Sequence, residues 1–420
     1  MNPANATYIG DTYLFNWPEE GVEITLDRIH ESKVGIGGRI SVRSAIFGKL
    51  HSPSNFNCTS QAPRQALARA LSERDAGIDW GAAIEQVCEL TQQRWEEGEP
   101  LIDLSEAEPS TTSRWAYEPW IETGGPTILF ADGGVGKSVF ALAIATALTT
   151  GTPILGGTVL GEPGPVLYLD WETSWQVHSE RLRALCLAED LQLPHIYYQS
   201  MTASFAESAS AIRKKIAQHG IRYVVVDSLG AARGGEPESA ETTIRLFNAG
   251  RTLGVPWLGI DHVTKNGGDK TRPFGSTYTH NLARLTWSME RAQEEGEDAT
   301  SIVLTNHKSN NGRLSYRRGY KVDFMLGDTD ELVEIVIQPQ DIRDMPAMRK
   351  KLRRQDQIFA AMREMNRAAT AEDIEGILKD DGIDLNLATI RATLHRYKDL
   401  FVPITEGGRI VSWGILSKYS

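Results

Sequence analysis

Cysteine is scarce in this sequence, and neither a long apolar run nor an excess of basic residues is present. The three cysteines, Cys58, Cys88 and Cys186, are scattered and lack the Cys-x-x-Cys spacing of metal clusters. This usage argues against a disulfide scaffold and a zinc cluster, and it fits a reducing cytoplasm. No stretch reaches the ~20 apolar residues that a membrane span needs, and the first residues lack the basic start and apolar run of a secretory signal. We expect a cytoplasmic protein without a membrane partner.

The charge balance is acidic, with a formal net charge of −11 from 44 basic and 55 acidic residues. This balance disfavours a protein that coats nucleic acid with its whole surface, but it permits binding through a few loops. Hydrophobic residues make up 41% and charged residues 24% of the chain, which is typical of globular proteins. Because 420 residues are too many for one ordinary core, two or three domains are expected.

The pattern of apolar and polar residues changes along the chain and predicts its domains. Residues 1–97 mix short strands, broken by the glycines between positions 35 and 38, with helical spacing, which predicts a small α+β domain of unknown role. Residues 98–122 are rich in Pro, Ser, Thr and Glu and predict a linker. The pattern further predicts a larger domain over residues 123–340 and a small C-terminal domain over residues 350–420.

Short apolar runs alternate with helical patterns between residues 123 and 340. This alternation predicts an α/β domain with a mostly parallel sheet and helices on both faces. The expected strands are 127–131, 166–170, 223–227, 257–261, 301–305 and 333–337, and the expected helices are 138–148, 179–191, 206–220 and 240–253.

The strongest chemical signal lies at residues 127–142, where an apolar strand runs into a glycine-rich turn and then into an apolar helix. This order is the required context of a phosphate loop. Glycines let backbone N–H groups approach a phosphate, and the N-terminus of the helix adds a favourable partial positive charge. Ala131 replaces the first glycine of the usual pattern, so the entry to the loop must avoid a positive φ. The residues expected to bind the phosphates and Mg²⁺ of ATP are Gly133, Gly134, Val135, Gly136, Lys137 and Ser138.

Three later strands end in side chains that suit the same ligand, namely Asp170 with Glu172, Asp227, and Asp261 with His262. Ligands bind outside the carboxyl ends of the strands in open parallel sheets, so these residues are expected at one edge. Asp227 suits the position that holds Mg²⁺, directly or through its water. Glu172 is the better candidate to polarise the attacking water, with Asp170 next. His262 is placed to sense the γ-phosphate.

Five motifs follow one another along this part of the chain. They are, in order, Gly-Gly-Val-Gly-Lys-Ser, Tyr-Leu-Asp-Trp-Glu, Val-Val-Val-Asp-Ser, Gly-Ile-Asp-His-Val-Thr-Lys and Phe-Gly-Ser-Thr-Tyr-Thr-His-Asn-Leu-Ala-Arg. Together they resemble the RecA-like ATPase core of RepA-type plasmid replicative helicases and their phage relatives, over about residues 120–325. The resemblance implies a RecA-like fold, a homo-oligomeric ring, usually a hexamer, and ATP bound between subunits.

The resemblance also implies roles for individual residues. Lys137 and Ser138 match the phosphate-loop pair, Glu172 the general base, Asp227 the Walker B aspartate, His262 the sensor histidine, and Arg284 the arginine finger that reaches a neighbour's γ-phosphate.

Two departures from the family pattern concern this finger. Phe274 stands where the family often has arginine, and Lys308-Ser309-Asn310 stands where DnaB-like relatives carry Lys-x-Arg. Arg284 must then supply the charge in trans, with Lys308 or Arg313 as alternatives.

Two loops are candidates for contact with single-stranded DNA in a ring channel, 231–241 and 263–275. The second contains Lys265, Lys270 and Arg272 among glycines. A few cations per subunit, repeated around a ring, can bind the phosphates of a strand although each subunit is acidic. The alternative is an ordinary solvated loop.

The C-terminal region predicts three helices and a hairpin, which is a winged helix-turn-helix arrangement. The second helix begins at Thr370 with a capping box that uses Asp373, and the hairpin turns at 406–408. The third helix would present Arg391, Arg396 and Lys398 to duplex DNA. A docking role for another protein remains open, because residues 341–420 are only weakly basic, with 14 Lys and Arg against 12 Asp and Glu.

These patterns together predict an ATP-hydrolysing RecA-like DNA motor. We expect this motor to be a hexameric DNA helicase of plasmid or phage replication. The alternative is an ATP-gated DNA-binding protein, such as a loader or a recombination or regulatory ATPase, without unwinding activity. A small-molecule kinase is disfavoured, since it would need a lid with clustered arginines and has no use for a winged helix.

Overall fold

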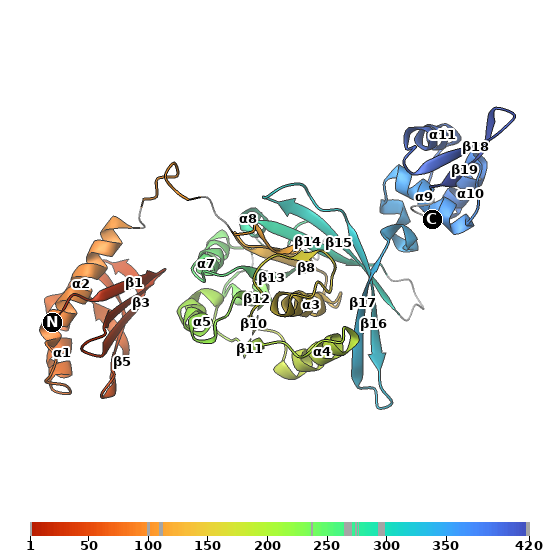
Figure 1. Cartoon of the computed structure of the whole chain (residues 1–420). Helices are drawn as coiled ribbons and strands as arrows, with labels where there is room; N and C mark the ends of the chain where they lie inside the picture. Colours follow the sequence, from red (N-terminus) through yellow and green to blue (C-terminus); the bar gives the residue numbers. More distant parts are fainter. Residues whose placement is uncertain are drawn as a thin grey trace. The chain divides into compact units, whose positions relative to one another are not determined.

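The structure is a computed structural model of the chain, and it describes residues 2–98, 101–108, 112–236, 238–263, 271–273, 275, 277–292 and 299–416. The chain forms two compact units. The first comprises Met1–Thr112, Ala203–Gly220 and Asn248–Gly254, and the second comprises Ser113–Thr202, Ile221–Phe247 and Val255–Ser420. Figure 1 shows the elements in colours that follow the sequence. No helix in these described ranges is long and apolar enough to cross a membrane.

The N-terminal part of the first unit is an antiparallel sheet with two helices, which confirms the α+β prediction. Its core includes Phe15, Ile24 and Ile40 from the sheet and Trp80 and Val87 from the second helix. The strands follow the order β1-β2-β3-β4-β5. The elements are β1 (Asn5–Ile9), β2 (Thr12–Trp17), β3 (Val22–Ser32), β4 (Gly35–Ser44), β5 (Gly48–Asn57), α1 (Gln61–Ser72) and α2 (Trp80–Glu97).

Gly37 and Gly38 do not break the strands, contrary to the sequence-based prediction, whereas Gly35, with φ +111°, begins β4 directly after the turn at 33–34. Gly37 and Gly38 lie inside β4, which pairs with β3 and β5. A Cβ atom on Gly37 would lie 2.7 Å from the carbonyl oxygen of Phe56, and one on Gly38 would lie 2.8 Å from that of Asp27. Glycine is therefore required here because neighbouring backbones approach closely, and not because the chain turns.

The second unit is built on a nine-stranded sheet in the order β11-β10-β12-β13-β8-β14-β15-β16-β17. The pairs from β11 to β14 are parallel, and the pairs from β14 to β17 are antiparallel. The sheet is thus mixed and mostly parallel, as predicted. Its strands are β8 (Thr127–Ala131), β10 (Val166–Asp170), β11 (Ile196–Ser200), β12 (Tyr223–Asp227), β13 (Trp257–His262), β14 (Leu285–Arg291), β15 (Thr300–Ser309), β16 (Arg318–Leu326) and β17 (Leu332–Gln340).

Helices cover both faces of this sheet (Figure 1). On one face, α3 (Lys137–Thr150) and α4 (Trp175–Ala188) share a core with the strands, in which Phe140, Leu185 and Ile260 are buried. On the other face, α6 (Leu229–Ala232) and α7 (Ala240–Arg251) lie over β13, where the rings of Phe247 and Trp257 are 5.5 Å apart. The helix between β11 and β12 in sequence is α5 (Phe205–His219).

The sequence missed three strands of this sheet and placed the linker too far along the chain. Strands β11, β14 and β16 were not predicted, since their sequences mix polar and apolar residues without a clean period. The second half of the predicted linker forms β6 (Trp115–Glu118) and β7 (Ile121–Glu122), which join β9 (Thr158–Val159) in a small sheet. Tyr117 and Trp120 of this segment are buried in the core of the second unit.

The C-terminal part contains the predicted three helices and hairpin. Thr370 and Asp373 form the capping box at the start of the second helix, and the turn of the hairpin has Gly407 and Gly408 at positive φ. Buried Ile374, Ile390 and other apolar residues form a separate core. The elements are η1 (Ile342–Asp344), η2 (Pro346–Lys351), α9 (Arg354–Met365), α10 (Ala371–Asp380), α11 (Leu387–Arg396), β18 (Phe401–Glu406) and β19 (Arg409–Ile415).

Candidate nucleotide site

The glycine-rich turn connects β8 to α3 with the backbone that a phosphate loop needs. Gly134 has φ +75° and Gly136 has φ +103°, where a side chain would be strained. Ala131 is the last residue of β8 and is absent from the positive-φ positions, so alanine is tolerated at the loop entry. Gly136 precedes the first turn of α3, so backbone N–H groups and the partial positive charge of the helix face one point.

The Lys137 side chain is folded back onto this loop. Its ammonium group donates hydrogen bonds to the carbonyl oxygens of Ala131, at 3.1 Å, and Asp132, at 2.8 Å. Burial lowers the pKa of Lys137, while nearby carboxylates, first that of Asp227, oppose this shift. The ammonium therefore lies among acceptors at the loop, in a position to compensate phosphate charge.

Ser138, in the first turn of α3, meets Asp227, the last residue of β12. The Ser138 hydroxyl donates to the Asp227 carboxylate at 2.8 Å, and the Tyr168 hydroxyl donates to the same carboxylate oxygen at 2.6 Å. Burial raises the pKa of Asp227, although both hydroxyls oppose the shift. Hydroxyl and carboxylate oxygens suit Mg²⁺, which takes its other ligands from phosphate and water. No cluster of three or more His, Cys, Asp or Glu that could hold a metal occurs among the described residues.

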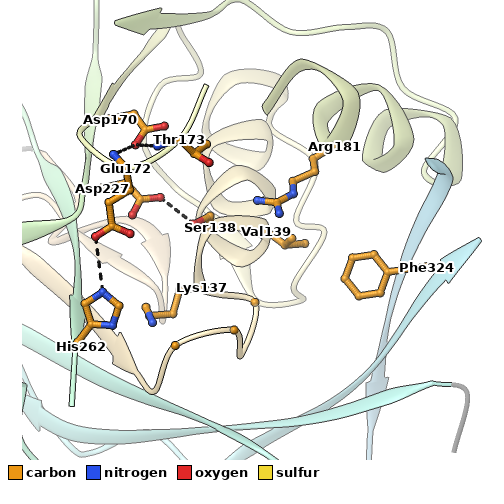
Figure 2. Close-up of a pocket in the computed structure, with 13 residues that line it drawn as sticks. Lys137, Ser138, Val139, Asp170, Glu172, Thr173, Arg181, Asp227, His262 and Phe324 are labelled. Atoms are coloured by element: carbon orange, nitrogen blue, oxygen red, sulfur yellow. Dashed lines mark hydrogen bonds and ion pairs between the residues drawn. The ribbon is translucent and has the colours of Figure 1, made fainter. Parts of the chain in front are cut away.

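Glu172 and His262 lie beside each other at the carboxyl edge of the sheet (Figure 2). His262 Nε2 is 3.6 Å from Glu172 Oε1, and the Ser228 hydroxyl also donates to the Glu172 carboxylate. The neighbouring His262 lowers the pKa of Glu172, and the hydrogen bond from Ser228 adds to the effect. The two side chains remain 47% and 37% exposed, so a water molecule and a ligand can reach them.

Asp170 is not available as the alternative base. Its side chain is 1% exposed, and its carboxylate accepts hydrogen bonds from the backbone N–H groups of Glu172, at 2.8 Å, and Thr173, at 3.1 Å. Its second oxygen lies 2.8 Å from His178 Nε2. Because every contact points inward, Asp170 supports the loop that carries Glu172.

These residues line one cavity of about 380 Å³, and four further members of its lining, Val139, Thr173, Arg181 and Phe324, were not predicted from the sequence. Arg181 from α4 and Phe324 from β16 flank Val139 on the side away from Glu172 (Figure 2). Phe324 is 47% exposed although it is aromatic. No motif marks either residue, since an arginine on an amphipathic helix and an aromatic residue in a strand are ordinary patterns.

Arg284 lies at the opposite edge of the sheet from the phosphate loop. Its N–H group donates to the carbonyl oxygen of Pro126 just before β8, whereas the loop begins after Ala131. The five residues of β8, at about 3.3 Å each, separate the two by about 17 Å, which is farther than an arginine side chain extends. Arg284 is exposed and lies near Glu122, whose pKa burial raises and the Arg284 charge partly lowers.

The alternative cations for the finger differ in their surroundings. The Lys308 ammonium donates to the carbonyl oxygens of His280, Asn281 and Ala283, at 3.0, 2.7 and 2.6 Å, at the end of α8 (Thr277–Leu282). These hydrogen bonds hold the Lys308 side chain, which extends from β15, at the C-terminal end of α8 in the same subunit. Arg313 is exposed in the segment between β15 and β16.

The residues predicted to contact nucleic acid are only partly covered by the structure. Lys265 and Lys270 lie outside the described residues, as does Phe274, and Arg272 is exposed. In the C-terminal part, Arg396 and Lys398 are exposed, and exposed Arg391 pairs with Glu372.

A buried ion pair near these loops was not expected from the sequence. Arg233, which follows α6, contacts the Asp261 carboxylate at 2.7 Å, and the two side chains are 0% and 1% exposed. Arg233 also donates to the Thr279 hydroxyl of α8 at 2.9 Å. Asp261 accepts from the backbone N–H group of His262, at 2.9 Å. Arg233, in the loop 231–241 that was a candidate for DNA contact, is therefore internal, and it fixes the strand end that carries His262.

Arg233→Leu should destabilise the second unit by about 3–5 kcal/mol, because it leaves the Asp261 carboxylate buried without its cation. The loss should appear as a lower thermal midpoint. Arg222→Leu is a matched control, since the Arg222–Glu162 pair is 45% and 73% exposed and such pairs contribute about 0–1 kcal/mol. An equal, small loss in both variants would contradict the structural role of the buried pair.

Comparison with known protein families supports the nucleotide site. A family model described as AAA domain matches residues 93–268, which include the phosphate loop, Glu172, Asp227 and His262. None of the curated proteins compared with the chain matches it. ATP binding is typical of the AAA domain, and the site described above has the parts that this activity requires. The comparison and the site together support an NTPase whose P-loop domain is similar to the AAA domain over residues 93–268.

Proposed function

We propose that this protein is an ATP-hydrolysing DNA motor that works as a ring of identical subunits, most simply a hexameric DNA helicase. The observation that carries the proposal is the position of Arg284. The backbone of this exposed residue lies about one strand length from its own phosphate loop, so we assign its guanidinium to the site of another copy. A nucleotide site that needs a second subunit is the basis of a ring motor.

The base of the nucleotide has a place in the same cavity. Phe324 offers an exposed aromatic face and Arg181 a planar cation, which together suit stacking against a purine. The phosphates would extend from there along α3 toward Lys137, Ser138 and Glu172. We therefore propose ATP as the nucleotide, with its base between Arg181 and Phe324.

The reaction follows from the positions of the side chains. Lys137 compensates the β- and γ-phosphate charge, and Ser138 with Asp227 would hold Mg²⁺, which when bound neutralises the charge that develops on the phosphates. Glu172 orients the attacking water and accepts its proton. His262 contacts Glu172 and ends β13, so it lies between the γ-phosphate and the segment that contains Arg272.

DNA is the proposed partner of the loop that holds Arg272 and of the C-terminal helices. The three helices α9 to α11, the β18–β19 hairpin and an additional bridge between Ala369 and Trp413 support a winged helix-turn-helix arrangement. In this reading, α11 would present Arg391 and Arg396 to duplex DNA, followed by Lys398. Docking to another protein is the rival role for these residues.

An ATPase assay with and without single-stranded DNA tests the motor, and displacement of a strand from a forked duplex tests unwinding. We expect DNA to stimulate hydrolysis and the forked duplex to open, and Lys137→Ala to remove both activities. DNA binding that requires ATP, with no displaced strand, would favour the second candidate, an ATP-gated DNA-binding protein. Hydrolysis without any response to DNA would contradict the motor.

Arg272→Ala combined with Lys270→Ala should weaken binding of single-stranded DNA and reduce the slope of log affinity against log salt by about 1–2 per engaged subunit. Each lost contact leaves the counterions of one phosphate bound to the DNA, so binding releases fewer ions and depends less on salt. DNA-independent ATP hydrolysis should be retained, which controls for folding. A slope equal to that of the parent would remove this loop from the DNA-binding surface.

A further inference from the structure

Next to the nucleotide cavity, a buried polar cluster connects β10 to α4. The carboxylate of Asp170, at the end of β10, lies 2.8 Å from Nε2 of His178 on α4, and the two side chains are 1% and 6% exposed. Tyr168 and Tyr198 enclose His178, with ring centroids at 4.5 and 5.6 Å. Neither Asp170 nor His178 has a part in the chemistry proposed above.

One carboxylate oxygen of Asp170 holds the segment that carries Glu172. Oδ1 accepts hydrogen bonds from the backbone N–H groups of both Glu172 and Thr173, and Oδ2 faces His178. The Tyr198 hydroxyl donates to the carbonyl oxygen of Thr173 at 2.9 Å. A rotation of the Asp170 carboxylate would break both hydrogen bonds to these backbone N–H groups. The orientation of the carboxylate therefore fixes the backbone at Glu172.

His178 makes the shorter of two side-chain contacts to Oδ2, at 2.8 Å, since the Tyr198 hydroxyl donates to the same oxygen at 3.4 Å. Its Nδ1 atom is buried without a hydrogen-bond partner in the described part of the chain, so the bond from Nε2 to Asp170 is the polar contact that the structure gives this ring. A buried nitrogen without a partner costs free energy, and an apolar residue would avoid that cost. The imidazole is thus retained for the one hydrogen bond that it makes.

We propose that the Asp170–His178 pair positions Glu172 for attack on the nucleotide. The pair acts through the backbone of Glu172, so both members are positioning residues. The inference depends on the proposed role of Glu172 as base. A base that shifts by about 1 Å can lose about a hundredfold in rate, whereas nucleotide binding at Lys137 and Arg181 is untouched.

The test compares His178→Phe with His178→Gln. Phenylalanine keeps the stacked ring and removes the hydrogen bond, so kcat for ATP hydrolysis should fall about 10–100-fold while KM and the affinity for a fluorescent ATP analogue stay within about twofold. Glutamine can place an N–H donor near the former Nε2 and should restore part of the loss. Cys186→Ala, at another buried position of α4, is the matched control and should leave kcat unchanged.

Three results would overturn the inference: kcat of His178→Phe within twofold of the parent, no recovery with His178→Gln, or an equal loss of kcat in Cys186→Ala. If His178→Phe does not fold, Asp170→Asn decides, since it keeps the volume and should also lower kcat without changing nucleotide affinity. Glu172→Gln separates this inference from the proposed function. If Glu172→Gln hydrolyses ATP normally, the base assignment is wrong; if it is inactive while His178→Phe is normal, only the positioning role is wrong.

Discussion

Glu172→Gln should abolish steady-state ATP hydrolysis, with a loss of about 10²–10⁴ in kcat, and should leave ATP affinity within a few-fold of the parent. The amide has nearly the shape of the carboxylate and can still bond to Ser228 and His262, but it cannot accept a proton from water. The hydrogen bonds that lower the pKa of Glu172 keep the parent carboxylate ionised, so a proton acceptor is present in the parent and absent in the variant.

The measurement combines a phosphate-release assay with binding of a fluorescent ATP analogue. Lys137→Ala is the comparison, because it should lose affinity as well as turnover, having lost the charge that compensates the phosphates. Turnover of Glu172→Gln within about threefold of the parent would place the base elsewhere. Asp170 is then a poor substitute, because its carboxylate is buried and is bonded to two backbone N–H groups.

Arg284→Ala should suppress hydrolysis by about 10³–10⁵ while the affinity for ATP and the fold stay nearly intact. An arginine that enters a neighbour's site stabilises charge that develops in the transition state, and this charge is absent when ATP only binds. The exposed position of Arg284, remote from its own phosphate loop, allows no other route to a γ-phosphate.

Mixing variants distinguishes a trans from a cis arginine. Subunits with Arg284→Ala and subunits with Glu172→Gln are both inactive alone, but a mixed ring contains interfaces that join an intact Glu172 to an intact Arg284. Such rings should recover part of the activity, and a cis-acting arginine would give no recovery. Verified mixed oligomers without any activity would discard the trans role.

A second cation, Arg313, serves as the control for this prediction. Arg313→Ala should leave hydrolysis within a few-fold of the parent, and a loss as large as that of Arg284→Ala would make Arg313 the finger instead. A structural role for Arg284, as partner of the buried Glu122, predicts a lower thermal midpoint with normal hydrolysis per folded subunit.

The phosphate loop and the strands that end beside it could be predicted from the sequence, because both depend on local rules. Glycines at fixed spacing between a strand and a helix specify a backbone that few other folds use, and this loop formed as expected around Gly134 and Gly136. Apolar runs that end in Asp227 and His262 specify buried parallel strands, whose carboxyl ends meet by construction. The capping box at Thr370 and the glycine turn at 407–408 are likewise local signals.

Only the tertiary structure decided which polar residues work at the surface of the site and which support it from inside. Asp170 and Glu172 are two positions apart in sequence, yet the first is buried against His178 and the second reaches His262. Arg233 resembled a loop cation and is instead fully buried on Asp261. These outcomes depend on burial and on partners 8 to 90 positions away in the sequence. Residue type and local spacing determine the chemistry of a side chain, whereas packing between distant segments determines its environment. For this reason the sequence alone predicted the nucleotide site but not the residues that hold it in place.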